Sequence, residues 1–152
     1  MKNLIIAAVL VISSFAVSAQ KSIAYKSPDQ QLNEAYCSGL FKTTDGTILD
    51  LVSNPIAGSY LNILDWLQGR VAGLQVFITR NGTKIPFLRN QQASIFVDEM
   101  QVSPARLEFL LSGDIAMIKV IKTPFFGGFN GSGGAIAIYT VKEDDEEEDE
   151  SK

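Results

Sequence analysis

The pattern of apolar and polar positions divides the middle of the chain into helices and strands. Between residues 62 and 73 the apolar positions recur at helical spacing, at Ile63, Leu64, Leu67 and Val71. Asn62 is a good N-cap for this helix, and Asp65 is placed to reach back to the cap or to face the helix dipole. Trp66 is expected at the edge of the same face. Gly73 is well placed to end the helix.

Short apolar runs bounded by turn residues predict the strands, which span residues 74–79, 93–98, 114–123 and 135–141. The turn signal Arg80–Thr83 stops the first strand, and the last strand is expected to close the sheet. Ser103 and Pro104 predict a second helix, with serine as the cap and proline at the first helical position, and Gly113 ends it. Few helices and short strands predict an α+β fold with a small mixed β-sheet and two short helices.

The segment before this pattern, residues 20–59, is mixed in character. The stretch "SPDQ" at Ser27–Gln30 and the stretch "SNP" at Ser53–Pro55 are turn signals. Asp45 and Gly46 stand between "LFKT" and "TILDLV", which predicts a β-hairpin. The sequence therefore divides into an N-terminal segment with a hairpin and a denser domain over residues 60–141.

Residues 1–19 have the composition of an export signal. Lys2 supplies the positive charge, residues 4–17 form an apolar run, and small residues precede the expected cleavage between Ala19 and Gln20. The alternative is a membrane anchor, but the run of roughly 14 residues is short of the ~20 needed to span a bilayer. The sequence therefore predicts export to the periplasm, with no transmembrane span after cleavage.

Charge is distributed unevenly along the chain. Eight of the seventeen acidic residues lie in Glu143–Glu150, whereas residues 20–142 hold eleven Lys/Arg and nine Asp/Glu, a net charge of +2. Adjacent like charges repel, so residues 142–152 are predicted to be a disordered acidic tail that keeps the protein soluble. Loose Ca²⁺ binding and attraction to a basic partner are the alternatives. No basic patch points to nucleic acid.

No stretch of the sequence carries recognisable chemistry. The chain has no histidine, which excludes serine–histidine and cysteine–histidine mechanisms and removes the commonest zinc ligands. The glycine loop Phe125–Ala135 leads into a strand rather than a helix, so it is expected to be a flexible or tightly turned connection and not a phosphate loop. Cys37 is expected to be buried and inert, and Asp98 to bind its own backbone in a turn. No catalytic, cofactor-binding or metal residue is predicted, and the chain is not expected to be an enzyme.

Four segments, in order, resemble the plug domain of TonB-dependent outer-membrane receptors of the Bacteroidetes type. The first is "NILDWLQGRVAGLQV", in which the family's helix ends in Leu-Gln-Gly-Arg-x-Ala-Gly. The others are "SIFVDE", "GDIAMIKVIK" and "NGSGGAIAIYT". The resemblance covers about eighty residues and implies structural roles for Asn62, Leu67, Gln68, Gly69, Arg70, Ala72, Gly73, Asp98, Ile118, Lys119, Gly131 and Gly134.

The chain departs from the family pattern at several points. Glu99 stands where a glycine is usual, which is expected to alter that turn. The arginine often found in the final glycine loop is missing, Asn130 takes the usual aromatic place, and no TonB box is clear before Tyr60. After Val141 only the acidic tail follows, so the sequence predicts a plug without its β-barrel.

The resemblance implies a non-catalytic interaction module of the periplasm, associated with outer-membrane transport. Its partner is expected to be an envelope protein, such as an outer-membrane transporter or an energy-coupling protein. Gly69 and Gly73 are then expected to let the helix pack closely and turn. Two alternatives remain open: a small-solute binding domain that uses the glycine loop with Arg70, Arg80 and Lys122, and a degenerate remnant of a larger receptor.

Overall fold

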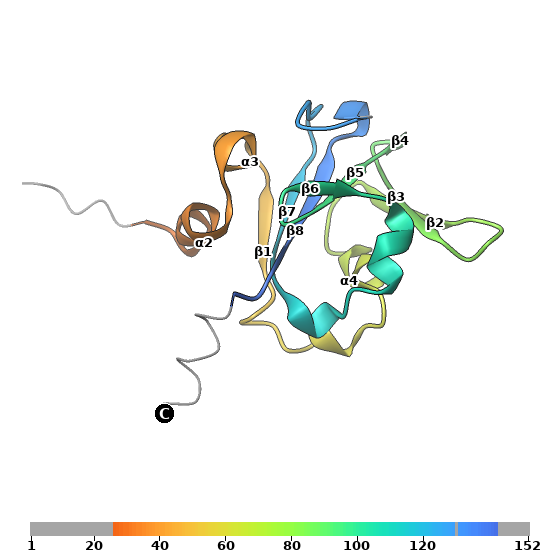
Figure 1. Ribbon diagram of the computed structural model, residues 1–152, viewed down its shortest axis with the longest axis horizontal. Helices are drawn as coiled ribbons and strands as arrows, with labels where there is room; N and C mark the ends of the chain where they lie inside the picture. Colours follow the sequence, from red (N-terminus) through yellow and green to blue (C-terminus); the bar gives the residue numbers. More distant parts are fainter. Residues whose placement is uncertain (1–25, 130, 143–152) are drawn as a thin grey trace, which may run out of the picture.

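The computed structural model describes residues 26–129 and 131–142. The predicted signal, the cleavage site at Ala19 and Gln20, and the acidic tail from Glu143 onward lie outside these ranges. Within them the chain forms three short α-helices and eight strands in two small sheets (Figure 1). The predicted α+β class with a small mixed sheet is confirmed.

The larger sheet has five strands in the order β1 (Thr47–Asp50), β7 (Ile115–Ile121), β8 (Ala135–Thr140), β5 (Ser94–Val97) and β6 (Met100–Val102). β5 and β8 run parallel, and the other neighbouring pairs are antiparallel. The last strand, β8, was expected to close the sheet, but it lies in the interior and pairs on both sides. The strands β7 and β8 are buried on both faces of the sheet, which explains their nearly continuous apolar sequences.

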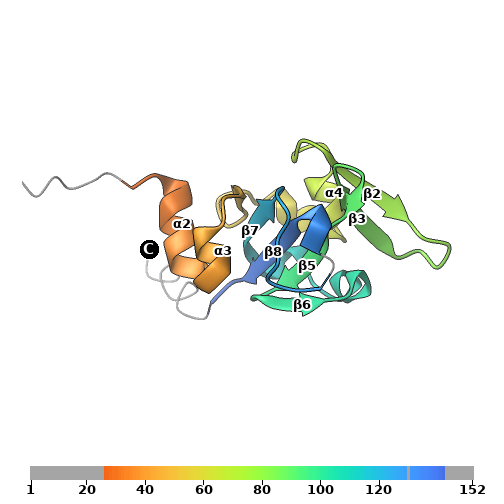
Figure 2. The same ribbon diagram turned by 90° about the horizontal axis from the view of Figure 1, so that it is seen from above.

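The smaller sheet is built on a hairpin of β2 (Leu74–Ile78) and β3 (Lys84–Leu88), with β4 (Gln91–Gln92) beyond β3. The predicted turn at residues 80–83 joins the two hairpin strands, and Gly82 takes the positive φ of +88° that the turn needs. The hairpin extends from the body on the side away from α2 and α3 (Figure 2). The sequence analysis did not predict β3, β4 or β6.

The five-stranded sheet is covered on both faces. One face packs against α4 (Ile63–Leu67) and the smaller sheet, in a core that contains Ile95, Ile118 and Ile136. The other face packs against α2 (Pro28–Tyr36) and α3 (Gly39–Thr43), around an aromatic cluster of Phe41, Phe96 and Phe125. The fold is therefore layered, with helices on both sides of one sheet (Figure 2).

The predicted N-terminal hairpin is wrong. The residues before Asp45 and Gly46 form the helix α3, and β1 after them pairs antiparallel with β7 rather than with the preceding segment. The buried Phe41 explains the difference, because the helix carries this ring into the aromatic cluster on the sheet. Tertiary packing overrides the local turn signal.

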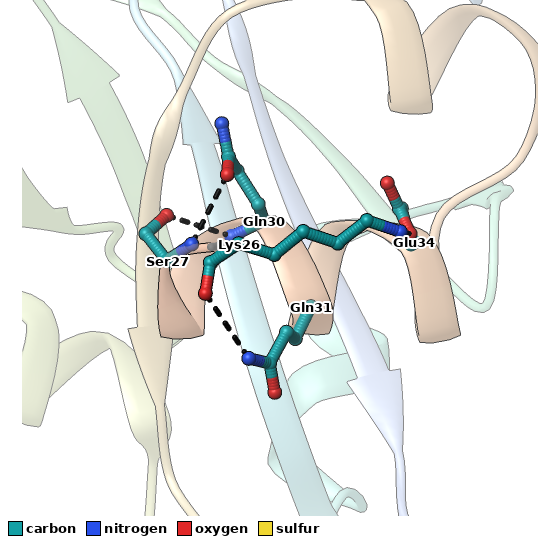
Figure 3. Close-up of polar contacts among 5 residues, drawn as sticks. All are labelled: Lys26, Ser27, Gln30, Gln31 and Glu34. Atoms are coloured by element: carbon teal, nitrogen blue, oxygen red, sulfur yellow. Dashed lines mark hydrogen bonds and ion pairs between the residues drawn. The ribbon is translucent and has the colours of Figure 1, made fainter. Parts of the chain in front are cut away.

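The stretch "SPDQ" is a helix start and not a turn (Figure 3). The Ser27 hydroxyl accepts a hydrogen bond from the Gln30 backbone N–H at 3.3 Å, and the Gln30 side chain accepts one from the Ser27 backbone N–H at 3.0 Å. This reciprocal pair is a capping box, and a proline at the first helical position completes it. Lys26 and Glu34 form an exposed ion pair along the same helix, and Gln31 binds the Lys26 carbonyl oxygen.

The predicted second helix is a 3₁₀ helix, η2 (Pro104–Glu108), and not an α-helix. Ser103 makes no side-chain capping bond, and Gly113 falls within another 3₁₀ turn, η3 (Ser112–Asp114). Leu107 is the one buried residue of η2, so a longer helix would gain little burial to stabilise it.

Candidate interaction surface

The helix that opens the plug-like motif begins where the sequence predicts and ends earlier. The Asn62 side-chain oxygen accepts a hydrogen bond from the Leu64 backbone N–H at 3.0 Å, which confirms the N-cap. The helix stops at Leu67 and not at Gly73, because Gly69 takes a φ of +91° that no helix contains. Gly73 also has a positive φ, of +82°. A Cβ at either glycine would meet nothing within 4 Å. Glycine is therefore needed at these two positions for the turn and not, as expected, for close packing of the helix.

Arg70 completes the end of this helix. Its Nη1 donates to the Trp66 carbonyl oxygen at 2.8 Å, and its guanidinium carbon lies 4.6 Å from the Trp66 ring centroid. The ring of Tyr60 lies 6.0 Å away. Trp66 was expected at the edge of the buried face, but it is fully buried. Arg70 therefore satisfies a helix carbonyl and covers the indole.

The rest of the motif connects the helix to β2. Leu67 is fully buried, and the Gln68 backbone N–H donates to the Leu64 carbonyl oxygen as the helix ends. Ala72 is exposed. The Gly73 carbonyl oxygen accepts from the Arg89 backbone N–H at 3.2 Å, which fixes the start of the β2–β3 ladder. Asp65 does not reach back to the cap; it forms an ion pair with Lys84 of β3.

Asp98 and Glu99 form the turn between β5 and β6, and both have positive φ, +47° and +66°. Asp98 was expected to bind its own backbone. Its carboxylate instead accepts from the Thr140 backbone N–H and from the Thr140 hydroxyl, each at 3.0 Å. The turn therefore ties the end of β5 to the end of β8.

Glu99 carries a function that a glycine at this position would lack. Its carboxylate accepts hydrogen bonds from the backbone N–H and the hydroxyl of Ser38, between α2 and α3. The Tyr139 hydroxyl donates to the same carboxylate at 3.3 Å. The departure from the family pattern thus fastens the N-terminal helices to the sheet.

Ile118 and Lys119 lie side by side in β7 and point to opposite faces of the sheet. Ile118 is fully buried against α4 and its neighbours. Lys119 is only 2% exposed, and its ammonium donates to the Asn33 side-chain oxygen at 2.7 Å and to the Phe41 carbonyl oxygen at 2.6 Å. Burial lowers the pKa of this ammonium.

Of the flexible or tightly turned connection that the sequence predicts, the glycine loop takes the tightly turned form. A Cβ on Gly131 would lie 1.5 Å from the Phe125 carbonyl oxygen, and one on Gly134 would lie 2.2 Å from the Ile121 carbonyl oxygen. Gly134 also has a φ of +83°. Backbone therefore occupies the space where side chains would stand, and the loop enters β8.

The structure places these motif residues at four separate points of the fold: α4 and the start of β2, the end of β5, the middle of β7, and the start of β8. Within the described ranges, no group of three or more Cys, Asp or Glu residues is arranged to hold a metal ion. Their contacts join elements of the fold to one another.

Cys37 is buried, as predicted, beside Tyr139. Burial raises the pKa of the Cys37 thiol above its ordinary value. Burial, together with the hydrogen bond to Cys37, also raises the pKa of the Tyr139 phenol. Both groups therefore stay protonated in the folded protein, and the thiol is not activated as a nucleophile.

The hairpin presents an apolar face to solvent. Phe77 and Phe87 are diagonal neighbours across the two strands, with ring centroids 5.1 Å apart, and Phe77 is 53% exposed. Together with Ile85 and with Ile78, which is 67% exposed, they line a shallow groove of about 370 Å³. We call these four groove-lining residues the hairpin face; Phe77, Ile85 and Phe87 share one face of the two strands, and Ile78 borders the groove at the end of β2. The hairpin face was not predicted from the sequence. A signal for it was present, because apolar residues in "LQVFI" occur on both faces of the strand and not on one face alone.

A second apolar groove of about 270 Å³ lies beside β6. Met100, Val102 and Phe109 line it, and Arg106 and Asp98 are its charged members. Phe126 and Phe129, in the glycine loop, are also largely exposed. Exposed aromatic clusters of this kind are typical of protein interaction surfaces.

None of the helices in the described ranges combines the length and the apolar character that a bilayer crossing requires.

The layered α+β fold is similar to part of several solved transport proteins. The RagAB peptide importer in its open-open state matches with a TM-score of 0.54 and 22% identity, over 64% of this chain and 12% of that chain. The RagAB peptide transporter matches with a TM-score of 0.53 and 26% identity, over 66% and 13%. The ferric enterobactin receptor PfeA of Pseudomonas aeruginosa matches with a TM-score of 0.53 and 16% identity, over 78% and 19%.

These neighbours define the class of the fold as TonB-receptor-like. The chain spans less than a fifth of the length of each of them, and at these identities the likeness concerns the fold. No family model and no curated protein matches the chain.

Proposed function

We propose that this chain is a plug-like, non-catalytic interaction module of the cell envelope. It is exported, its signal is removed between Ala19 and Gln20, and it acts in the periplasm beside the outer membrane. Its partner is a protein of outer-membrane transport, either a transporter or an energy-coupling protein. No nucleic acid and no cofactor enters this function.

The hairpin face is the observation that carries the proposal. Its two aromatic and two aliphatic side chains leave an apolar groove of about 370 Å³ open to solvent, outside the two buried cores of the fold. Exposed apolar surface is unfavourable in water, and a protein partner that covers it removes that penalty. The TonB-receptor-like fold supports a transport protein as this partner.

Contacts elsewhere in the fold support an interaction module over an enzyme. Lys119 is engaged with the Asn33 side chain and the Phe41 carbonyl oxygen, and Cys37 and Tyr139 are engaged with each other, at the boundary between the N-terminal helices and the sheet. Arg70, which the solute-binding alternative needs, lies against Trp66.

Affinity capture from an envelope extract tests the proposal. The mature chain is used as bait, with and without Glu143–Lys152, and captured proteins are identified by mass spectrometry after mild crosslinking. Capture of an outer-membrane transporter or an energy-coupling protein is the expected result. Loss of capture when the tail is removed would show that the acidic tail contributes to partner binding.

A Phe77→Glu variant makes this capture specific to the hairpin face, because Phe77 is largely exposed and its replacement leaves the cores intact. Lys42→Glu, at an exposed position of α3 on the other side of the molecule, is the matched control. A folded bait that captures no envelope protein would contradict the proposal, and thermal stabilisation by a small solute would then favour the solute-binding alternative.

A further inference from the structure

Among residues 26–129 and 131–142, no strand lies beside the outer side of the β2 backbone, because β2 is at the edge of the three-stranded sheet. The Arg89 backbone N–H donates to the Gly73 carbonyl oxygen, so these two residues form a hydrogen-bonded pair. Hydrogen-bonded and non-bonded pairs alternate along an antiparallel ladder. Val76 and Ile78 therefore turn their backbone N–H and C=O groups away from β3.

The position of Pro86 agrees with this assignment. Pro86 stands opposite Val76 in the ladder, and its carbonyl oxygen accepts from the Ala93 backbone N–H at 3.0 Å, on the side of β4. A proline has no N–H to donate, and none is needed toward β2 at a non-bonded pair. The Val76–Pro86 pair thus leaves the Val76 backbone groups directed to the outer edge.

The outer edge of β2 lacks the features that usually prevent strands from adding to a sheet. Its five residues, Leu74–Ile78, include no charged residue and no proline, and its register with β3 runs without a bulge. Natural edge strands are commonly blunted by charge, proline or bulges. An uncharged, regular edge is a template for another strand.

The hairpin face lies beside this edge and supplies a place for side chains. Phe77 and Ile78 belong to β2 itself, and the groove that they form with β3 is about 370 Å³. A strand added at the edge would point every second side chain onto this face. The geometry therefore fits an extended polypeptide with apolar residues at alternate positions.

The charged residues of the segment that contains the hairpin are all positive. Residues 66–97 contain Arg70, Arg80, Lys84 and Arg89 and no acidic residue. Lys84 is paired with Asp65, whereas Arg80, in the hairpin turn, and Arg89, after β3, have no ion pair within the described ranges. A partner with acidic residues at its ends complements these two cations.

We propose that the β2 edge accepts an extended segment of a partner protein, apolar at its centre and acidic at its ends, as an added strand of the smaller sheet. This inference rests on the proposed function and names how that partner binds. A second copy fits less well, because antiparallel β2–β2 pairing would bring the Arg80 end of each copy to the Arg89 end of the other. The tail Glu143–Lys152 has no apolar residue to fill the groove.

Two synthetic peptides test the proposal against the full mature chain. Both have alternating Val and Thr residues at the centre; one ends in Asp and Glu, the other in Lys. We expect the acidic peptide alone to bind, to shift the amide NMR signals of Val76 and Ile78, and to slow hydrogen exchange at these two amides. Equal binding of both peptides, or shifts centred elsewhere, overturns the proposal.

Substitutions sharpen the same measurement. Arg80→Glu and Arg89→Glu should each weaken binding of the acidic peptide by about threefold to tenfold, whereas Lys42→Glu, an exposed control in α3 away from the hairpin, should not change it. Val76→Pro removes an edge N–H without removing a ladder hydrogen bond, so it should abolish the protection while the other hairpin amide signals stay in place. A Val76→Pro chain that binds like wild type overturns strand addition.

The same binding experiments distinguish the other molecules that could occupy the β2 edge. Dimerisation that competes with the peptide would assign the β2 edge to a second copy of the chain. Binding to vesicles of anionic phospholipid that competes with the peptide would assign it to a membrane. Either result would overturn the proposal. Failure of the proposed function is seen separately, as an absence of captured envelope proteins. A partner captured through crosslinks elsewhere would overturn strand addition and leave the proposed function in place.

Discussion

The Lys119 ammonium of β7 donates a hydrogen bond to the Asn33 side-chain oxygen of α2 at 2.7 Å. The two residues are far apart in the sequence, and the bond crosses the boundary between the N-terminal helices and the central sheet. Asn33 also donates from its side-chain nitrogen to the Lys42 carbonyl oxygen at 3.0 Å. A buried lysine thus holds α2 and α3 against the sheet.

Lys119→Met should destabilise the protein by about 1–3 kcal/mol, because it leaves the Asn33 oxygen and the Phe41 carbonyl without their buried donor. Urea unfolding measures this change in the free energy of unfolding. Lys122→Met is the matched control, since Lys122 is partly exposed, and should change stability by less than about 0.5 kcal/mol.

A double-mutant cycle separates the hydrogen bond from the packing. Lys119→Met and Asn33→Ala should show a coupling energy of about 0.5–3 kcal/mol, as contacting residues do. Strictly additive effects of the two substitutions would contradict a direct contribution of this bond to stability.

Glu99→Gly should leave the β5–β6 turn formed but loosen the N-terminal helices. Glycine relieves the positive φ of +66°, yet the loss of the bonds to Ser38 and Tyr139 outweighs this gain, with a net destabilisation of about 1 kcal/mol. Amide hydrogen exchange should speed up at Ser38 and stay slow in β5. A more stable variant with an unchanged Ser38 amide would show that strain dominates.

Stability should fall as the pH rises above about 9, through Cys37 and Tyr139. The pKa of each is raised in the folded protein above its ordinary value, 9.0 for the thiol and 10.0 for the phenol. Each group therefore stabilises the fold fully below its ordinary pKa, and this stabilisation is lost at higher pH because the unfolded chain ionises first. Lys119, with a lowered pKa, acts in the opposite sense.

The comparison of wild type with Cys37→Ala isolates the thiol. Thermal unfolding between about pH 8 and pH 10 should show a shallower loss of stability in the variant. Parallel curves for the two proteins would mean that the Cys37 thiol ionises in the fold as it does in the unfolded chain.

Alanine at three glycines should give three graded effects. Gly131→Ala should cost more than about 3 kcal/mol, because its Cβ meets the Phe125 carbonyl oxygen at 1.5 Å. Gly69→Ala should cost about 1 kcal/mol, from its positive φ alone. Gly113→Ala, with free space, should change stability by less than about 1 kcal/mol. Equal losses at Gly131 and Gly113 would contradict the packing of the loop.

Local signals in the sequence predicted those elements whose determinants are local. The Asn62 cap, the turn at Arg80–Thr83 and the apolar strands β5, β7 and β8 depend on neighbouring residues, and the structure contains them. The α2 start was also visible, since Ser27 is followed by Pro28 and by Gln30 at the spacing of a capping box, but the same residues are typical of turns.

The remaining features depend on contacts between distant residues. Asp98 binds Thr140, and Glu99 binds Ser38, so neither role can be derived from the turn that contains them. The helix that opens the motif ends at Leu67 because Gly69 adopts a left-handed conformation, although its apolar spacing continues. The hairpin face was missed because β3 was not predicted, and the partner strand of β2 decides which side chains are exposed.

Crosslinking from the hairpin face tests the central claim most directly. A photoreactive residue replaces Phe77 in the full chain, in cells that express it, and a matched chain carries the same residue at Glu108, which is exposed in η2. We predict that position 77 crosslinks to an outer-membrane transporter or an energy-coupling protein and that position 108 does not. A folded, exported chain that crosslinks to no envelope protein from position 77, or equally from both positions, would contradict a protein-binding function of the hairpin face.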